Sequence, residues 1–163
     1  MRASIFDVDR LIPQSPVLMD IFHQARGIIS YRVRGCLLSV ADLRGACLAG
    51  HDILLGRLSA EEVSANSMGN KKKAWALGKS PDSRTSWELR QPNVDDGVRG
   101  GAVRGKSSII ACHGTGYEKL DEALALVVAV KAMDLTLHLA QRCARVSFND
   151  HFLPLWQGVR KFR

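Results

Sequence analysis

The feature of the sequence that most constrains the fold is an apolar stretch that ends at Val130. Its apolar residues cover more than half of the circumference of a helix. A helix with so little polar surface has to be surrounded by other elements, so we predict that it lies at the centre of the fold. The chain has 163 residues, about one domain's worth, to build around it. This prediction rests on Leu120, Ala123, Leu124, Val127, Val128 and Val130.

Two further helices are indicated before this stretch. Residues 16–33 carry apolar side chains at helical spacing behind a Ser15-Pro16 start, in which the proline occupies the first helical position. Ser59 and Glu62 match a capping box, in which each side chain accepts a hydrogen bond from the other residue's backbone N–H. The second pattern predicts a helix that begins at residue 60.

The rest of the chain is also interpreted as mostly helical. Residues 35–56 are interrupted by glycines, and we expect one or two short helices there. Another helix is expected after Asp134, which is a suitable cap. Strands are expected only at residues 3–8 and 108–112. We therefore predict a mainly α fold, a compact helical domain with one or two short strands, with α+β as the alternative class.

Residues 78–106 differ in character from the segments on either side. These 29 residues hold five glycines, two prolines and six lysines or arginines, without apolar periodicity of either kind. Such a segment is typical of a functional loop or a linker, so we interpret it as a mobile basic loop. It divides the chain into an N-terminal helical part, 1–77, and a C-terminal helical part, 107–163, which we expect to form one folded domain.

The charge of the chain favours a polyanionic partner. There are 23 Lys and Arg residues against 16 Asp and Glu, a net charge of +7. Our leading hypothesis is a small, non-catalytic regulatory or accessory protein that binds DNA or RNA. Residues 134–162 are loosely similar to a helix-turn-helix, which would present Arg145, Asn149 and His151 to base edges. The expected phosphate contacts are Lys71, Lys72, Lys73, Arg99, Arg104, Lys106, Arg160 and Lys161.

Two segments support an alternative hypothesis of a phosphate-handling enzyme or nucleotide binder. Gly100–Ser107 matches the phosphate-loop pattern GxxxxGK[ST], in which Gly100, Gly105, Lys106 and Ser107 are the defining residues. That motif requires a buried strand before it and a helix after it. The second segment, Cys112–Gly116, is a glycine-rich turn before the long apolar helix, where free backbone N–H groups bind anions.

The residues Ile5-Phe6-Asp7-Val8-Asp9 resemble the first motif of the haloacid-dehalogenase phosphatases, an apolar strand that ends in DxD. The resemblance implies a nucleophile at Asp7 and a general acid/base at Asp9. It covers five residues, and Arg10-Leu11 stands where that family has Gly-Thr. Two surface carboxylates after a strand are the simpler interpretation.

The remaining expectations concern cysteines, metals, membranes and proteins. The four cysteines include no CxxC pair, which indicates reduced thiols in a cytoplasmic protein. Cys47 and His51 are four residues apart, but structural zinc needs two close pairs, so we expect no metal, and we expect no cofactor either. No apolar run is long enough to span a bilayer. A second alternative function is binding to an acidic protein surface through the basic loop.

Overall fold

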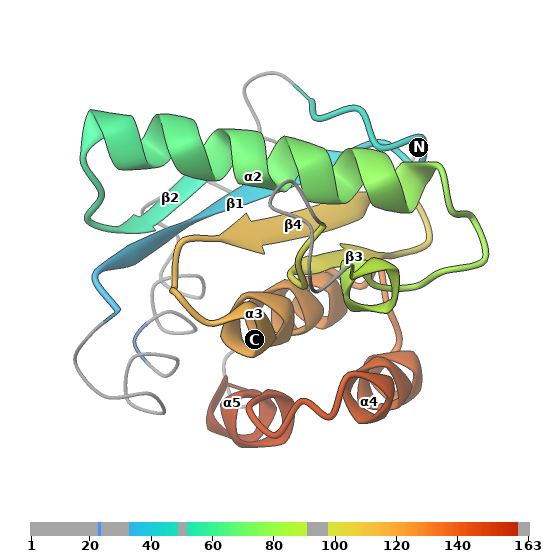
Figure 1. Ribbon diagram of the computed structural model, residues 1–163. Helices are drawn as coiled ribbons and strands as arrows, with labels where there is room; N and C mark the ends of the chain where they lie inside the picture. The colour runs from blue at the N-terminus through green and yellow to red at the C-terminus, as the bar shows by residue number, and fades with distance from the viewer. Residues whose placement is uncertain (1–22, 24–32, 49–51, 91–97, 160–163) are drawn as a thin grey trace.

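The computed structural model describes residue 23 and residues 33–48, 52–90 and 98–159. Over these residues the chain forms a four-stranded antiparallel sheet with the strand order β2-β1-β4-β3. Helix α2 (Ala60–Gly78) covers one face of the sheet, and helix α3 (Glu118–Lys131) covers the other (Figure 1). Helices α4 (Leu137–Val146) and α5 (Phe152–Val159) pack beyond α3 as an outer layer.

The centre of the sheet is formed by two strands that are distant in sequence. Strand β1 (Gly35–Ala41) pairs with β4 (Ile109–His113), with Leu37 opposite His113 and Ala41 opposite Ile109. The edges are β2 (Ile53–Gly56) beside β1 and β3 (Ala102–Arg104) beside β4. The backbone of residues 84 and 85 bonds to the outer edge of β3, next to the short 3₁₀ helix η2 (Ser86–Leu89).

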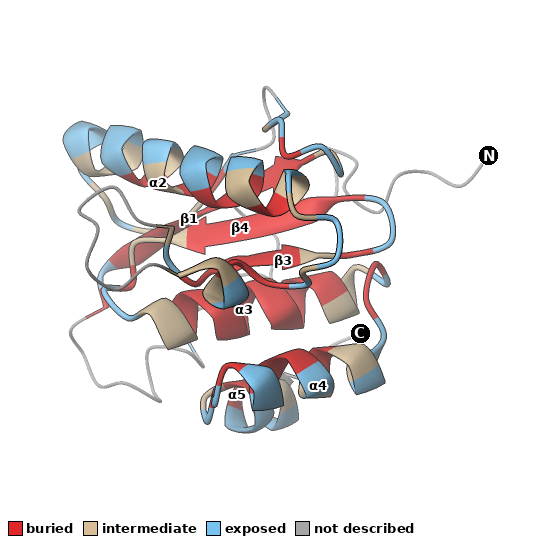
Figure 2. Ribbon diagram, turned by 45° about the vertical axis from the view of Figure 1, so that its right-hand side comes forward, coloured by how far each residue is buried: buried red, intermediate tan, exposed pale blue. Residues whose placement is uncertain are grey.

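The predicted central helix is confirmed as α3. Ten of its fourteen residues are buried, because the sheet covers one side and α4 and α5 cover the other (Figure 2). The capping box is confirmed as well: Ser59 Oγ accepts from the N–H of Glu62, and Glu62 Oε1 accepts from the N–H of Ser59. Helix α2 then runs without interruption through Gly69 to Gly78.

The predicted mainly α class is wrong, because sheet and helices both make up large parts of the fold. The error lies at residues 35–56, where the structure has β1 and β2 instead of short helices. All seven residues of β1 are buried, so neither of its faces shows the polar alternation that identifies a half-exposed strand. A short apolar run of this kind fits a buried strand and a buried helix equally well.

Residues 78–106 are not structureless where the structure describes them. They contribute the end of α2, the 3₁₀ helix η2 and the edge strand β3. The strand expected at 108–112 is confirmed as β4. The helix expected after Asp134 is α4, although Thr136 is its cap. The strand expected at 3–8 and the helix expected at 16–33 lie outside the described residues.

None of the helices described here combines the length and the apolar character that crossing a membrane requires.

Candidate functional site

The exposed side of α2 carries a stripe of basic and apolar side chains. Met68, Lys72, Trp75 and Lys79 follow one another at spacings of four, three and four residues, which places them on one face of the helix. The Trp75 side chain is 53% exposed, and Lys79 Nζ lies 4.5 Å from the centre of a Trp75 ring. Together with the neighbouring exposed Lys71, we call these five residues the α2 stripe.

Carboxylates are confined to the other end of α2. Glu61 and Glu62 lie in its first turn, and Glu62 pairs with Arg34 at 2.8 Å. From Val63 to Lys79 the sequence contains no Asp or Glu. The acids lie at the positive end of the helix dipole and the lysines toward its negative end, so the distribution stabilises the helix while it separates the charges. The stripe is therefore cationic along its length.

The inward side of α2 has a different role, which corrects the prediction for Lys73. This lysine is 2% exposed, and its Nζ donates to the Cys112 carbonyl at 2.7 Å and lies 3.8 Å from Asp121 Oδ2. Burial lowers the pKa of Lys73 and raises that of Asp121. A lysine held in this way is part of the core and is not available to a phosphate group.

The turn at Cys112–Gly116 is built by the same carboxylate. Asp121 Oδ1 accepts from both the N–H and the hydroxyl of Thr115 and lies 3.8 Å from Cys112 Sγ, on the α3 side of the sheet. The His113 ring lies on the α2 side, close to Gly69. Burial raises the pKa of the Cys112 thiol far above its ordinary value, so this cysteine is a core residue and not a nucleophile.

His113 is the unusual residue of this turn. Its Nδ1 is buried without a hydrogen-bond partner among the described residues. Burial, with a smaller contribution from the positive charges of Lys73 and Arg99, lowers the pKa of His113 to about 4. The imidazole is therefore neutral at physiological pH, and it does not face Cys112 as a base would.

The phosphate-loop match does not have the required context. Gly100–Ser107 covers β3 and the turn into β4, so a strand and not a helix follows it. The Gly100 N–H donates to a Glu118 carboxylate oxygen at 2.9 Å, and the Ser107 N–H and hydroxyl both donate to Asp134. Carboxylates thus occupy donors that a phosphate would need, and Lys106 is an exposed turn residue.

Arg99 and Arg104 differ in their surroundings. Arg99 is exposed. The guanidinium of Arg104 is directed at backbone carbonyl oxygens and ties the end of α2 to the segments beside it. Burial lowers the pKa of Arg104. Arg104 is therefore a structural residue, and its guanidinium donates to the carbonyls of Leu43, Leu77, Ser80 and Ser83.

The C-terminal segment does not present the expected base-reading set. Asn149 is buried, and its Nδ2 donates to the Lys119 carbonyl at 2.7 Å and to Glu122 Oε2 at 2.8 Å. His151 is half-buried, whereas Arg145 is exposed. Helix α5 has no charged residue, unlike a helix that reads DNA. Arg160 and Lys161 lie outside the described residues.

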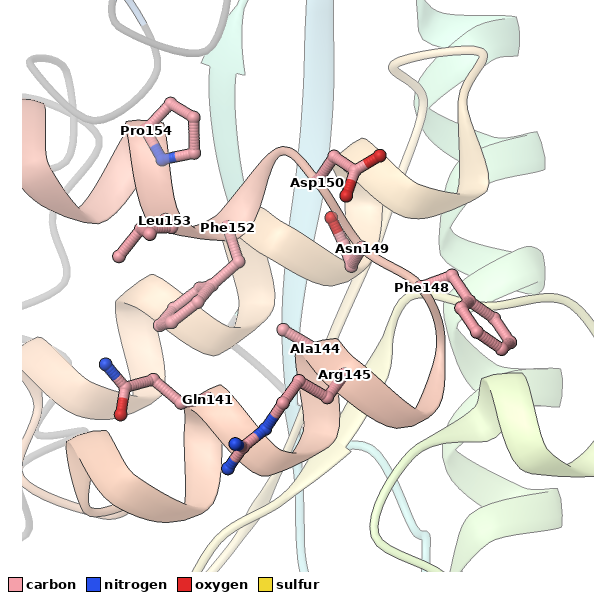
Figure 3. A pocket seen from close by; sticks show the side chains of 9 residues that line it. All are labelled: Gln141, Ala144, Arg145, Phe148, Asn149, Asp150, Phe152, Leu153 and Pro154. Atoms are coloured by element: carbon pink, nitrogen blue, oxygen red, sulfur yellow. The ribbon is translucent and has the colours of Figure 1, made fainter.

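A groove lies between α4 and α5 instead, and we call it the α4–α5 groove (Figure 3). Its volume is about 690 Å³. Arg145 and Gln141 line it from α4, and Leu153 and Pro154 line it from α5, while Phe148 lies at the other side of the site. The lining is completed by Ala144, Asn149, Asp150 and Phe152.

The remaining sequence patterns are a pair with metal-ligand spacing, Cys47 and His51, and the DxD pair Asp7 and Asp9. The described residues contain no group of three or more His, Cys, Asp or Glu side chains arranged to hold a metal ion. Asp7, Asp9 and His51 lie outside the described part of the chain, so the DxD pair and the Cys47/His51 pair have no structural description.

Lys71 and Lys72 of α2 were predicted from the sequence as phosphate contacts, but the surface that they share with Met68 and Trp75 was not. The signal was present in the spacing of Met68, Lys72, Trp75 and Lys79. The α4–α5 groove has no comparable signal, since it depends on the angle between two short helices.

No known protein family matches this chain, and comparisons with curated proteins and with solved structures give no significant match. Function is therefore inferred from the geometry of the α2 stripe and of the α4–α5 groove.

Proposed function

We propose that this protein binds single-stranded DNA or RNA through the α2 stripe. The observation that supports this proposal is an exposed indole, Trp75, set among lysines on a helix face without carboxylates. Aromatic side chains stack on unpaired bases of any sequence, and lysines neutralise the phosphates between them. Both kinds of group are spaced along about three turns of α2.

Single strands fit this surface better than duplexes do. The bases of a duplex are stacked on one another, so a flat indole on a helix surface has no base face to contact. Sequence readout in a duplex needs side chains that reach base edges, and the amide of Asn149 is already bonded inside the fold. The expected activity is therefore sequence-tolerant binding of unpaired strands by an accessory protein.

The test is fluorescence anisotropy with labelled single-stranded DNA, single-stranded RNA and duplex DNA at low and near-physiological salt. We expect the single strands to bind more tightly, with an affinity that falls as salt is raised. Trp75→Ala should weaken binding about 5- to 150-fold, the loss of one stacked base. Tyr117→Ala removes an exposed aromatic ring outside the stripe and should leave the affinity unchanged.

Lys71→Gln provides a second, independent measurement. Losing one phosphate contact should reduce the slope of log affinity against log salt by about 0.7 for a single strand. The absence of binding at low salt would refute the proposal. So would binding that Trp75→Ala and Lys71→Gln leave at the wild-type level.

A further inference from the structure

Two of the side chains that line the α4–α5 groove, Phe148 and Leu153, are apolar and exposed to solvent. Phe148 is 74% exposed, Val146 is 55% exposed and Leu153 is 48% exposed. Val146 is the last residue of α4 and is not part of the groove lining, whereas Phe148 follows the cap residue Ser147 and Leu153 lies across the groove on α5. Isolated exposed apolar residues are ordinary, but exposed apolar side chains that line one groove are typical of a protein-binding surface.

Phe148 is held in position by its backbone. It has a φ of 52°, the left-handed region that bulky side chains rarely adopt. Its N–H donates to the Arg145 carbonyl at 3.2 Å, and its own carbonyl accepts from Lys119 Nζ at 2.9 Å. These bonds fix the backbone of the turn, while the ring extends into solvent. The ring contributes little to the core, so its position needs another explanation.

The charges at the groove favour an acidic occupant. Arg145 lines the groove, and Arg142 is exposed on the same helix. Asp150 is the one carboxylate among the lining residues, and Lys119 adds a positive charge nearby, where its Nζ donates to the Phe148 carbonyl. The residues of α5 include no charged side chain that would offset the positive charges of α4. The result is an apolar groove with a cationic α4 border.

We propose that the α4–α5 groove binds an acidic, amphipathic helical segment of a partner protein. The apolar face of such a helix would lie on the exposed side chains of Phe148 and Leu153, and its carboxylates would pair with Arg142 and Arg145. This arrangement is the helix-in-groove mode, which uses apolar anchors at helical spacing. It is independent of nucleic-acid binding, which we assign to the α2 stripe.

A second copy of this chain fits the groove less well. The exposed carboxylates of α2 lie in its first turn, beside Ala60 and Ser64 and without a large apolar neighbour. The acids of α3 are bonded within the fold: Glu118 to Arg90, Asp121 to Thr115 and Glu122 to Asn149. No described helix of this chain therefore presents an exposed apolar face flanked by acids.

The experiment is a selection from a displayed library of amphipathic helical peptides with randomised flanking charges, carried out on the full chain. We expect the enriched peptides to be acidic and to have Leu or Phe at helical spacing. Arg145→Glu should lower their affinity at least tenfold, and Leu153→Ser should do the same. The matched controls are Arg57→Glu and Leu43→Ser, which change exposed residues outside the groove.

A charge exchange makes the test specific. Peptides in which Glu is replaced by Lys should bind Arg145→Glu better than they bind the wild type. An empty selection, enrichment of basic peptides, or peptides that bind Arg145→Glu and Leu153→Ser normally would overturn the proposal. So would a loss of oligonucleotide binding in the groove variants, because that result would assign the groove to nucleic acid.

Discussion

Lys73 Nζ and Asp121 Oδ2 lie 3.8 Å apart, although their helices cover opposite faces of the sheet. The two side chains meet beside Gly101, at the beginning of edge strand β3. A Cβ at Gly101 would lie 2.6 Å from Lys73 Nζ and 3.1 Å from Asp121 Cβ. Because Gly101 has no side chain, Lys73 from α2 and Asp121 from α3 can approach each other there, and their ion pair connects the two helical layers.

Removing one member of this pair should be costly. Lys73→Met leaves the Asp121 carboxylate and the Cys112 carbonyl without their cationic partner inside the core. We expect a loss of about 3–5 kcal/mol in the free energy of unfolding, measured by urea denaturation. The double variant Lys73→Met/Asp121→Asn should lose less than the sum of the two single changes, since no charge is then left unpaired. Strict additivity would show that the pair is not coupled.

Gly101→Ala should destabilise the protein, because the added methyl group would occupy the space in which Lys73 and Asp121 meet. Its backbone φ of 130° is strained for any residue with a Cβ, and the added atom would lie 2.5 Å from the Cys112 carbonyl oxygen. We expect a lower urea midpoint and a decrease of several kcal/mol in the free energy of unfolding, comparable to overpacking in a protein core. Gly116→Ala is the control for φ alone, because it has φ 85° but meets no atom within 4 Å. Equal losses in the two variants would contradict the steric explanation.

Stability should fall as the pH is lowered from about 6.5 to about 4 because of His113. The folded-state pKa of about 4 lies below the ordinary value near 6.5, so the unfolded chain binds more protons within this window. The slope approaches 1.4 kcal/mol per pH unit for one full proton, and partial solvent access reduces it. Urea midpoints of His113→Gln should depend less on pH than those of the wild type. The exposed His138→Gln is the control and should follow the wild type.

Asn149→Ala should affect stability and not oligonucleotide binding. The amide bonds both the Lys119 carbonyl and the buried Glu122 carboxylate, whose pKa is already raised by burial. Loss of these bonds leaves buried polar atoms unpaired, at a cost of about 1–3 kcal/mol. Thermal unfolding and anisotropy on the same sample separate the two effects. A tighter or weaker oligonucleotide complex without a change in stability would restore Asn149 as a base-reading residue.

The sequence was informative where a local signal decided the structure. The Ser59–Glu62 capping box locates the start of α2, and the apolar circumference of 120–130 identifies α3 as the central helix. Both features depend on residues within one element. The helix boundary that was predicted wrongly depends on residues distant in sequence. Asp134 was expected to cap a helix, but its carboxylate accepts hydrogen bonds from Ser107 and Ser108 in the β3–β4 turn.

The candidate sites were harder to predict than the elements, for the same physical reason. Lys71 and Lys73 are two residues apart, yet one is exposed and the other is buried against Asp121. Which of them faces solvent depends on how α2 is rotated about its own axis relative to the sheet. The sequence of α2 is only weakly amphipathic and does not determine that rotation. Asn149 likewise belongs to a polar pattern in the sequence but is buried by the packing of α3 against α5.

The pairing of β1 with β4 also has a consequence during translation. When a ribosome has synthesised the chain as far as Gly56, β1 has only β2 to bond with, and its other edge is bare. That edge exposes unpaired backbone N–H and C=O groups between apolar side chains, and it stays unpaired until His113 has been added and has left the exit tunnel. The nascent protein therefore carries an unpaired strand edge that favours aggregation while residues 57–113 are being added, and the central β1–β4 pairing can form only after β4 has emerged.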